Sequence, residues 1–116
     1  MKGKYQAAFI VPIGANKVLG EDGWEFESTG RLSEEIKDYL IESLRLSFLE
    51  RYLGIESYVD GDIKMSVIFD ENNEIENIYF QLYEDTLTVL SEVCQDSRVS
   101  AGGELFIPQG IKVSDS

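Results

Sequence analysis

The chain contains no histidine and only one cysteine among its 116 residues. A serine or cysteine triad and a structural zinc site therefore both lack their usual residues. The ten glycines also never fall into the spacing of a phosphate loop or of a dinucleotide fingerprint. These absences predict no catalytic residue, no cofactor and no metal site, and they favour a protein that is not an enzyme.

The cysteine and hydropathy patterns also bear on where the protein acts. Cys94 cannot form an internal disulfide, and no asparagine glycosylation triplet occurs, so nothing indicates an oxidising compartment. The apolar run from Ala7 to Ile13 is short and contains Pro12, which favours a buried strand over a signal peptide. No stretch approaches the roughly 20 apolar residues of a membrane helix. We therefore expect a soluble, cytosolic protein.

Basic residues are scarce: 10 Lys and Arg stand against 22 Asp and Glu, which gives a net charge of -12. Such a chain repels phosphate backbones and anionic lipid headgroups, so we expect no nucleic-acid partner and no membrane partner. The same field attracts a basic protein. The acid is concentrated in two blocks: residues 21–42 hold eight acidic and two basic residues, and residues 68–100 hold eight and one.

The chain has enough apolar residues to fold, because 43% of it is hydrophobic, including six Tyr and six Phe. We predict a single domain over residues 1–116 with a frayed tail at 112–116. Asp22-Gly23 is a turn signal and predicts a hairpin or flap over Val18–Phe26. Apolar runs and period-two alternation predict strands at Tyr5–Val11, Ile63–Phe69, Ile78–Tyr83 and Glu104–Ile107.

Two helices are predicted between these strands. Ser33 can cap the first, and the two acidic residues after it face the positive end of the helix dipole. We expect this helix to run to Leu53, where Gly54 can take the left-handed conformation that ends many helices. Asp85 is expected to cap a shorter second helix, which carries Cys94 on its apolar side as a core residue rather than a nucleophile.

The resulting element order is strand, helix, strand, strand, helix, strand. It resembles the split pattern of ferredoxin-like folds, an α+β class with a βαββαβ order, a four-stranded antiparallel sheet and two helices on one face. The resemblance covers most of the chain, and it implies no function because this fold carries many. A possible extra β-hairpin between the first strand and the first helix is the main departure.

Trp24 and the acidic residues around it form the first candidate site. The cluster resembles a protein-binding hot spot, because Trp supplies buried area and carboxylates steer a basic partner. The alternative is that Trp24 plugs the end of the core while its acidic neighbours stay solvated. The predicted contacts are Trp24, Glu21, Asp22, Glu25 and Glu27, with Glu34, Glu35 and Asp38 reinforcing the field.

The second candidate site is the sheet face away from the helices. There Ile68, Tyr79 and Tyr83 alternate with the predicted core residues. An apolar open face is typical of an interface, and a homodimer could form through it. Three alternatives stay open: the Trp24 hairpin covers the face, the C-terminal tail covers it, or the register is shifted by one residue, which exchanges the two faces.

Carboxylates are the only plentiful functional groups. Asp70, Asn72 and Glu74 repeat the oxygen spacing of a calcium loop, and Asp60 and Asp62 offer another pair. The first set lacks the glycine and the final glutamate of an EF-hand, so a polar hairpin turn is the simpler interpretation. A carboxylate pair acting as general acid and base stays open, because the sequence places no pair in a pocket.

These observations favour a compact, acidic, non-catalytic inhibitor of a basic protein, of the kind typified by immunity proteins and antitoxins. The hypothesis depends on the segregated charge, the missing catalytic groups and the Trp24 hairpin. One alternative is a dimeric ferredoxin-like enzyme or ligand-binding subunit that uses the sheet face. Another is a structural subunit of a larger assembly, which the sequence does not separate from an inhibitor.

Overall fold

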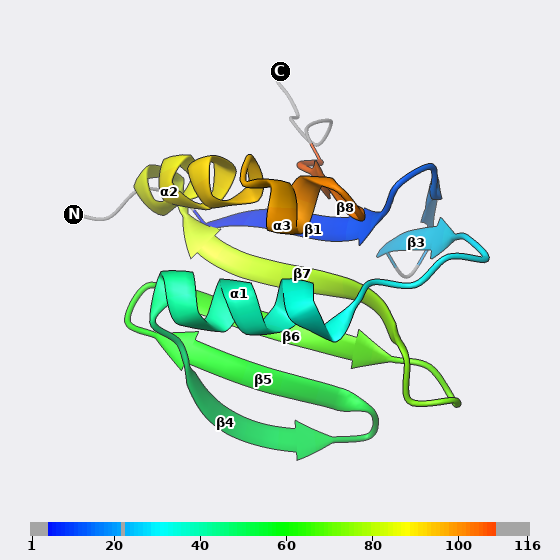
Figure 1. Cartoon of the computed structure of the whole chain (residues 1–116), viewed down its shortest axis with the longest axis horizontal. Helices are drawn as coiled ribbons and strands as arrows, with labels where there is room; N and C mark the ends of the chain where they lie inside the picture. Colours follow the sequence, from blue (N-terminus) through cyan, green and yellow to red (C-terminus); the bar gives the residue numbers. More distant parts are fainter. Residues whose placement is uncertain (1–4, 22, 109–116) are drawn as a thin grey trace.

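The computed structural model of the chain describes residues 5–21 and 23–108, so the tail predicted at 112–116 lies outside it. Within these residues the largest element is an antiparallel sheet of six strands in the order β4-β5-β6-β7-β1-β8 (Figure 1). A separate two-stranded sheet is formed by β2 and β3. The strands are β1 Tyr5–Pro12, β2 Asn16–Gly20, β3 Gly23–Glu27, β4 Ser47–Tyr52, β5 Ile55–Asp60, β6 Ile63–Phe69, β7 Ile75–Tyr83 and β8 Gly103–Phe106.

The predicted four-stranded ferredoxin-like fold is wrong. Over the described part of the chain the main sheet has six strands, the hairpin β2–β3 forms a second sheet, and the helices are few and short. The difference arises because the stretch predicted as one long helix contains a shorter helix followed by the hairpin β4–β5. These two strands extend the sheet past β6 and make β4 its outer edge.

The helices begin close to the predicted positions. The side chain of Ser33 caps α1 (Glu34–Leu44) as predicted. The second helix, α2 (Glu84–Cys94), begins before Asp85 and has no side-chain cap, so the predicted cap is wrong. A short α3 (Ser97–Ser100) follows. No helix among the described residues is long and apolar enough to cross a membrane.

Helix α1 ends at Leu44 because the next residues close its last turn. Arg45 has a left-handed φ of 58°. The Leu46 N–H donates to the Ile41 carbonyl at 2.9 Å, and the Arg45 N–H donates to the Glu42 carbonyl at 3.3 Å. This pair of hydrogen bonds is a Schellman motif, which satisfies the free carbonyls of a helix and turns the chain away from its axis. The predicted continuation of the helix is therefore wrong.

The hairpin β4–β5 follows, and its turn contains only Leu53 and Gly54. Tyr52 pairs with Ile55 across the strands, and the two turn residues have positive φ values of 52° and 78°. Two-residue hairpin turns of the primed types need such values, because their twist matches that of the strands. Gly54 thus serves a hairpin turn and not the end of a helix.

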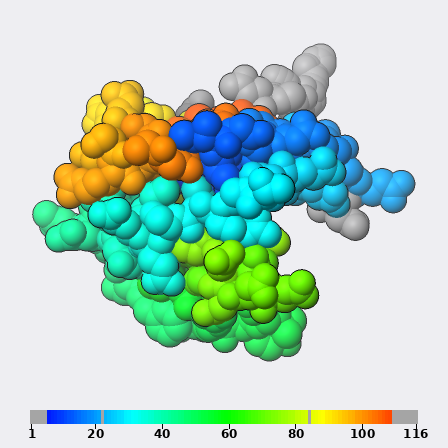
Figure 2. Space-filling model, turned by 45° about the vertical axis from the view of Figure 1, so that its right-hand side comes forward, coloured from blue at the N-terminus to red at the C-terminus, as the bar shows by residue number. Residues whose placement is uncertain are grey.

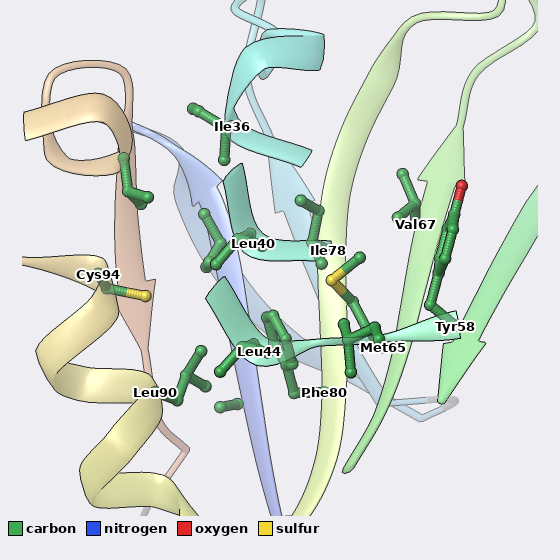
Figure 3. Packing of buried hydrophobic residues seen from close by; sticks show 14 of the residues in the cluster. Ile36, Leu40, Leu44, Tyr58, Met65, Val67, Ile78, Phe80, Leu90 and Cys94 are labelled. Atoms are coloured by element: carbon green, nitrogen blue, oxygen red, sulfur yellow. The ribbon is translucent and has the colours of Figure 1, made fainter. Parts of the chain in front are cut away.

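One cluster of buried apolar side chains lies between the sheet and the helices. Figure 3 shows Leu40 of α1 beside Ile78 of β7, with Leu90 of α2 near Leu44 and Cys94 of α2 on the same side of the cluster as Leu90. Val99 of α3 belongs to the same cluster, so all three helices cover one face of the sheet. Burial raises the pKa of the Cys94 thiol to about 12, which leaves it as a protonated core residue.

The hairpin β2–β3 packs on the opposite face of the sheet. The ring of Phe26 lies 4.9 Å from that of Phe9 in β1, and Trp24 meets Phe106 of β8 edge-on at 4.9 Å between ring centroids. Phe9 alternates with the fully buried Ala8 and Ile10, so it points away from the helices. In Figure 2 the light-blue hairpin projects at the right-hand side of the molecule.

Candidate functional site

The outer hairpin β4–β5 carries a group of exposed apolar side chains, which we call the edge patch. Its members are between 38% and 81% exposed, although they are large and hydrophobic. Every residue of β4 is exposed, and among the described residues β4 pairs on one side only. Large exposed apolar patches are common at surfaces that contact other molecules. The edge patch consists of Phe48, Leu49, Tyr52, Leu53 and Ile55.

The strand has charged residues and a register shift, which protect sheet edges in part, but it has no lysine and no proline. Natural edge strands are commonly guarded by lysine, proline or a covering loop. The cation of β4, Arg51, is not free for this role, because it donates to Glu56 at 2.8 Å and to Asn73 at 2.7 Å and lies over the ring of Phe69. A register shift at Leu49 is the remaining irregularity. Figure 1 shows β4 extending beyond the cover of α1.

The opposite edge of the sheet is better covered. Strand β8 is short, and its Phe106 is packed against Trp24 and Phe26. Its Glu104 accepts a hydrogen bond from Lys17 at 3.0 Å and another from the Gly14 N–H at 3.1 Å. These contacts tie the hairpin to β8, so the exposed edge of the described sheet is β4.

Acidic side chains lie along the exposed side of α1, and we call them the acidic stripe. Ile36, Leu40 and Leu44 bury the other side of the helix against the core. The stripe lies near the ion pair that joins Lys37 of α1 to Glu56 of β5, at 3.8 Å. It consists of Glu34, Glu35, Asp38 and Glu42, all of which are exposed.

Tyr58 connects the acidic stripe with the edge patch. Burial raises its pKa to about 12, helped by the hydrogen bond that its hydroxyl donates to Glu56 at 2.9 Å and by the nearby charges of Asp38 and Glu34. The Tyr58 ring also meets Phe48 of the edge patch edge-on, at 5.5 Å between centroids. Phe48 therefore has negative charge near it on the helix side of β4, whereas Tyr52 and Ile55 pair across the strands and, with Ile68, belong to the opposite face.

The predicted Trp24 cluster is divided between two sides of the hairpin. Trp24 is partly buried and turned toward the sheet, while Glu21, Glu25 and Glu27 are exposed. Asp22 lies outside the described residues. The tryptophan and the acids therefore do not form one surface, and the partner contact predicted for them stays a prediction.

The sheet-face residues are also separated. Ile68 and Tyr79 line a hollow of about 450 Å³ beneath the hairpin, whereas Tyr83 immediately precedes α2 and does not line it. The register is the predicted one, because Met65 and Val67 point into the core. Of the alternatives, cover by the Trp24 hairpin applies to part of this face, and Pro108 also lines the hollow, while the tail after Pro108 lies outside the described residues. A homodimer through the remaining face stays a prediction.

The calcium-like spacing belongs to a turn. One oxygen of Asp70 accepts the N–H groups of Asn72 and Glu74 at 2.8 and 2.9 Å, and the other accepts from Arg31 at 2.8 Å. The carboxylate thus organises the β6–β7 connection and has no free oxygen directed at an ion. Within the described residues no three acidic or cysteine side chains are grouped closely enough to hold a metal.

The edge patch is the feature that sequence reasoning missed. The signals that could have indicated it are the alternation around Phe48, Glu50 and Tyr52 and the position of Gly54 between two β-rich runs. In the comparisons with known proteins, no family model matches the chain, and no curated protein and no solved structure gives a significant match.

Proposed function

We propose that the chain is a non-catalytic binding protein that captures a basic protein partner. The observation that carries the proposal is the edge patch on the β4–β5 hairpin, where Phe48 meets Tyr58 close to the charges of Asp38 and Glu34. The patch supplies apolar area, and the stripe supplies charge that a basic surface complements. A second copy of the chain fits this surface poorly, because each copy brings a net charge of -12.

Strand addition is the binding mode that suits β4. An extended segment of the partner would pair with the open side of the strand through its backbone, and its apolar side chains would pack on the edge patch. Lysine or arginine side chains of that segment would reach Asp38 and Glu34, whose charges already act on Tyr58. Binding by strand addition requires no catalytic group and no cofactor.

The backbone conformation of Leu53 supports the proposal that the edge patch binds a partner. It has a positive φ of 52° and is 81% exposed, in a turn where asparagine is the favoured first residue. An exposed leucine in this conformation is unfavourable for the free protein, so its presence fits a contact with another molecule.

An inhibitor is the form of this function that the charge supports best. A compact acidic domain can cover the positive cleft of a nuclease, as immunity proteins and antitoxins do. The single cysteine of the chain is in keeping with action in the cytosol.

Affinity capture with matched variants tests the proposal. The full chain serves as bait at low salt, beside Leu49→Lys, Leu53→Asn and the control Val89→Lys. Val89 is 47% exposed on α2, so the control adds the same charge away from β4. We expect a basic protein to be retained by the parent and the control, and more than about tenfold weaker binding by both edge variants.

We expect Leu53→Asn to be more stable than the parent by about 0.5–1 kcal/mol, because asparagine tolerates positive φ.

Three outcomes would contradict the proposal. Equal retention by the edge variants would show that β4 is not the contact. A captured protein that is acidic would remove the role of the stripe. A dimer in light scattering that Leu49→Lys dissociates would make a second copy the natural occupant of the edge.

A further inference from the structure

The hollow beneath the hairpin has the walls of a small-molecule site. It lies on the sheet face opposite the helices, and aromatic rings from three strands border it. Its volume of about 450 Å³ falls within the range of known ligand pockets, which are mostly apolar with a few polar groups. The residues used in the argument are Phe9, Trp24, Phe26, Ile68, Asn77 and Tyr79.

Asn77 adds a polar group to these walls. Its side-chain oxygen is buried and has no hydrogen-bond partner within the described part of the chain. Buried polar atoms in folded proteins nearly always have a partner, so an exception at the wall of a hollow points to a donor that arrives from outside. The asparagine pairs in register with Ile68 of β6, on the face that the hairpin covers.

The cover of the hollow is attached to the main sheet through side-chain contacts. The hairpin β2–β3 is a separate sheet, held to the main one through the rings of Trp24 and Phe26 and through Glu104. Ring contacts of this kind can rearrange without breaking the ladder of the main sheet. A small movement of the hairpin would open the way to Asn77.

We propose that this hollow binds a planar, uncharged aromatic molecule of about two fused rings that carries an N–H or O–H donor. The rings would lie among Phe9, Trp24 and Tyr79, and the donor would satisfy the Asn77 oxygen. An anion is disfavoured by the net charge of -12. This site is independent of the edge patch, so the failure of one proposal leaves the other standing.

The test uses indole and 1-benzofuran, two rings of the same shape that differ in one N–H donor. The protein is labelled with ¹⁵N, and because the chain has a single tryptophan, the indole N–H signal reports on Trp24 alone. We expect both probes to shift this signal in a saturable way, with indole bound about three- to tenfold more tightly, as one added hydrogen bond predicts.

Three variants separate the donor from the shape of the site. Asn77→Leu keeps a side chain branched at Cγ and removes the amide, so the two probes should bind it equally. Gln81→Leu, on the same strand and face but outside the hollow, should keep the preference for indole. Ala7→Phe fills the hollow and should abolish the binding of both probes. Dispersion of the amide spectrum shows that each variant is folded.

Several results would overturn the proposal. The first is a Trp24 signal that does not shift, or shifts linearly, with either probe up to about 1 mM. The second is equal affinity of the parent protein for the two probes. The third is binding that begins only when the chain is truncated after Pro108, because the C-terminal segment would then be the natural occupant.

Discussion

Asp70 shows how one side chain can organise a turn, and it leads to a prediction about acid pH. The Glu74 N–H and the Arg31 side chain hold the pKa of Asp70 below its ordinary value of 3.8, because both hydrogen bonds favour the carboxylate. A group whose folded pKa is lowered stabilises the protein above its unfolded pKa, and this stabilisation is lost as the pH falls through the folded value.

We therefore expect Asp70→Asn to lower the melting temperature at pH 7, and the gap to the parent to narrow below about pH 4. Thermal melts followed by circular dichroism between pH 7 and pH 3 measure this difference. Glu71→Gln, which removes the same charge from an exposed neighbour, should leave the melting temperature nearly unchanged. A gap that stays constant across the pH range would rule out the ionised turn as its source.

The elements differ in how well their sequences define them. Strands β1, β6 and β7 follow from apolar runs and alternation, and α1 begins at the predicted Ser33 cap. The hairpin β4–β5 could not be found in this way, because Phe48 and Tyr52 lie four residues apart and fit a helix face as well as a strand. Only the backbone conformation at Arg45 decides between them, and arginine carries no signal for a left-handed φ.

The candidate site, like the fold, was predictable from the sequence only in part. The acidic residues of α1 stand out in the sequence by composition alone. The edge patch does not stand out in the sequence. In the predicted helix to Leu53 its residues would be covered, whereas in the observed edge strand they are exposed. An error in one element boundary therefore hid the surface on which the proposed function depends.

Arg45 allows the two boundaries to be distinguished by experiment. In the structure it has a φ of 58°, so Arg45→Gly should stabilise the protein by about 0.5–1 kcal/mol by removing strain. In the interior of a helix running to Leu53, the same substitution would destabilise by about 1 kcal/mol. Urea denaturation of the parent and the variant gives the sign directly. A destabilised variant would contradict the Schellman end of α1.

At the scale of the whole molecule, acidic residues outnumber the basic residues with which they could form ion pairs. The described ion pairs, such as Lys17–Glu104 and Arg51–Glu56, are at least partly exposed. Pairs of this kind contribute about 0–1 kcal/mol each. With 22 acidic and 10 basic residues, most carboxylates have no cation to pair with, so repulsion among them is the larger long-range effect.

Salt should therefore act in opposite directions on the free protein and on its complex. Raising NaCl from about 0.02 M to 0.5 M shortens the range of charge interactions to a few ångströms, which relieves the repulsion within the folded chain. We expect the melting temperature of the free protein to rise, measured by differential scanning calorimetry. The same salt should weaken capture of the basic partner, because the attraction of the acidic stripe is screened as well. A melting temperature that falls with salt would mean that the ion pairs outweigh the repulsion. Capture that does not change with salt would leave the apolar edge patch as the sole source of binding.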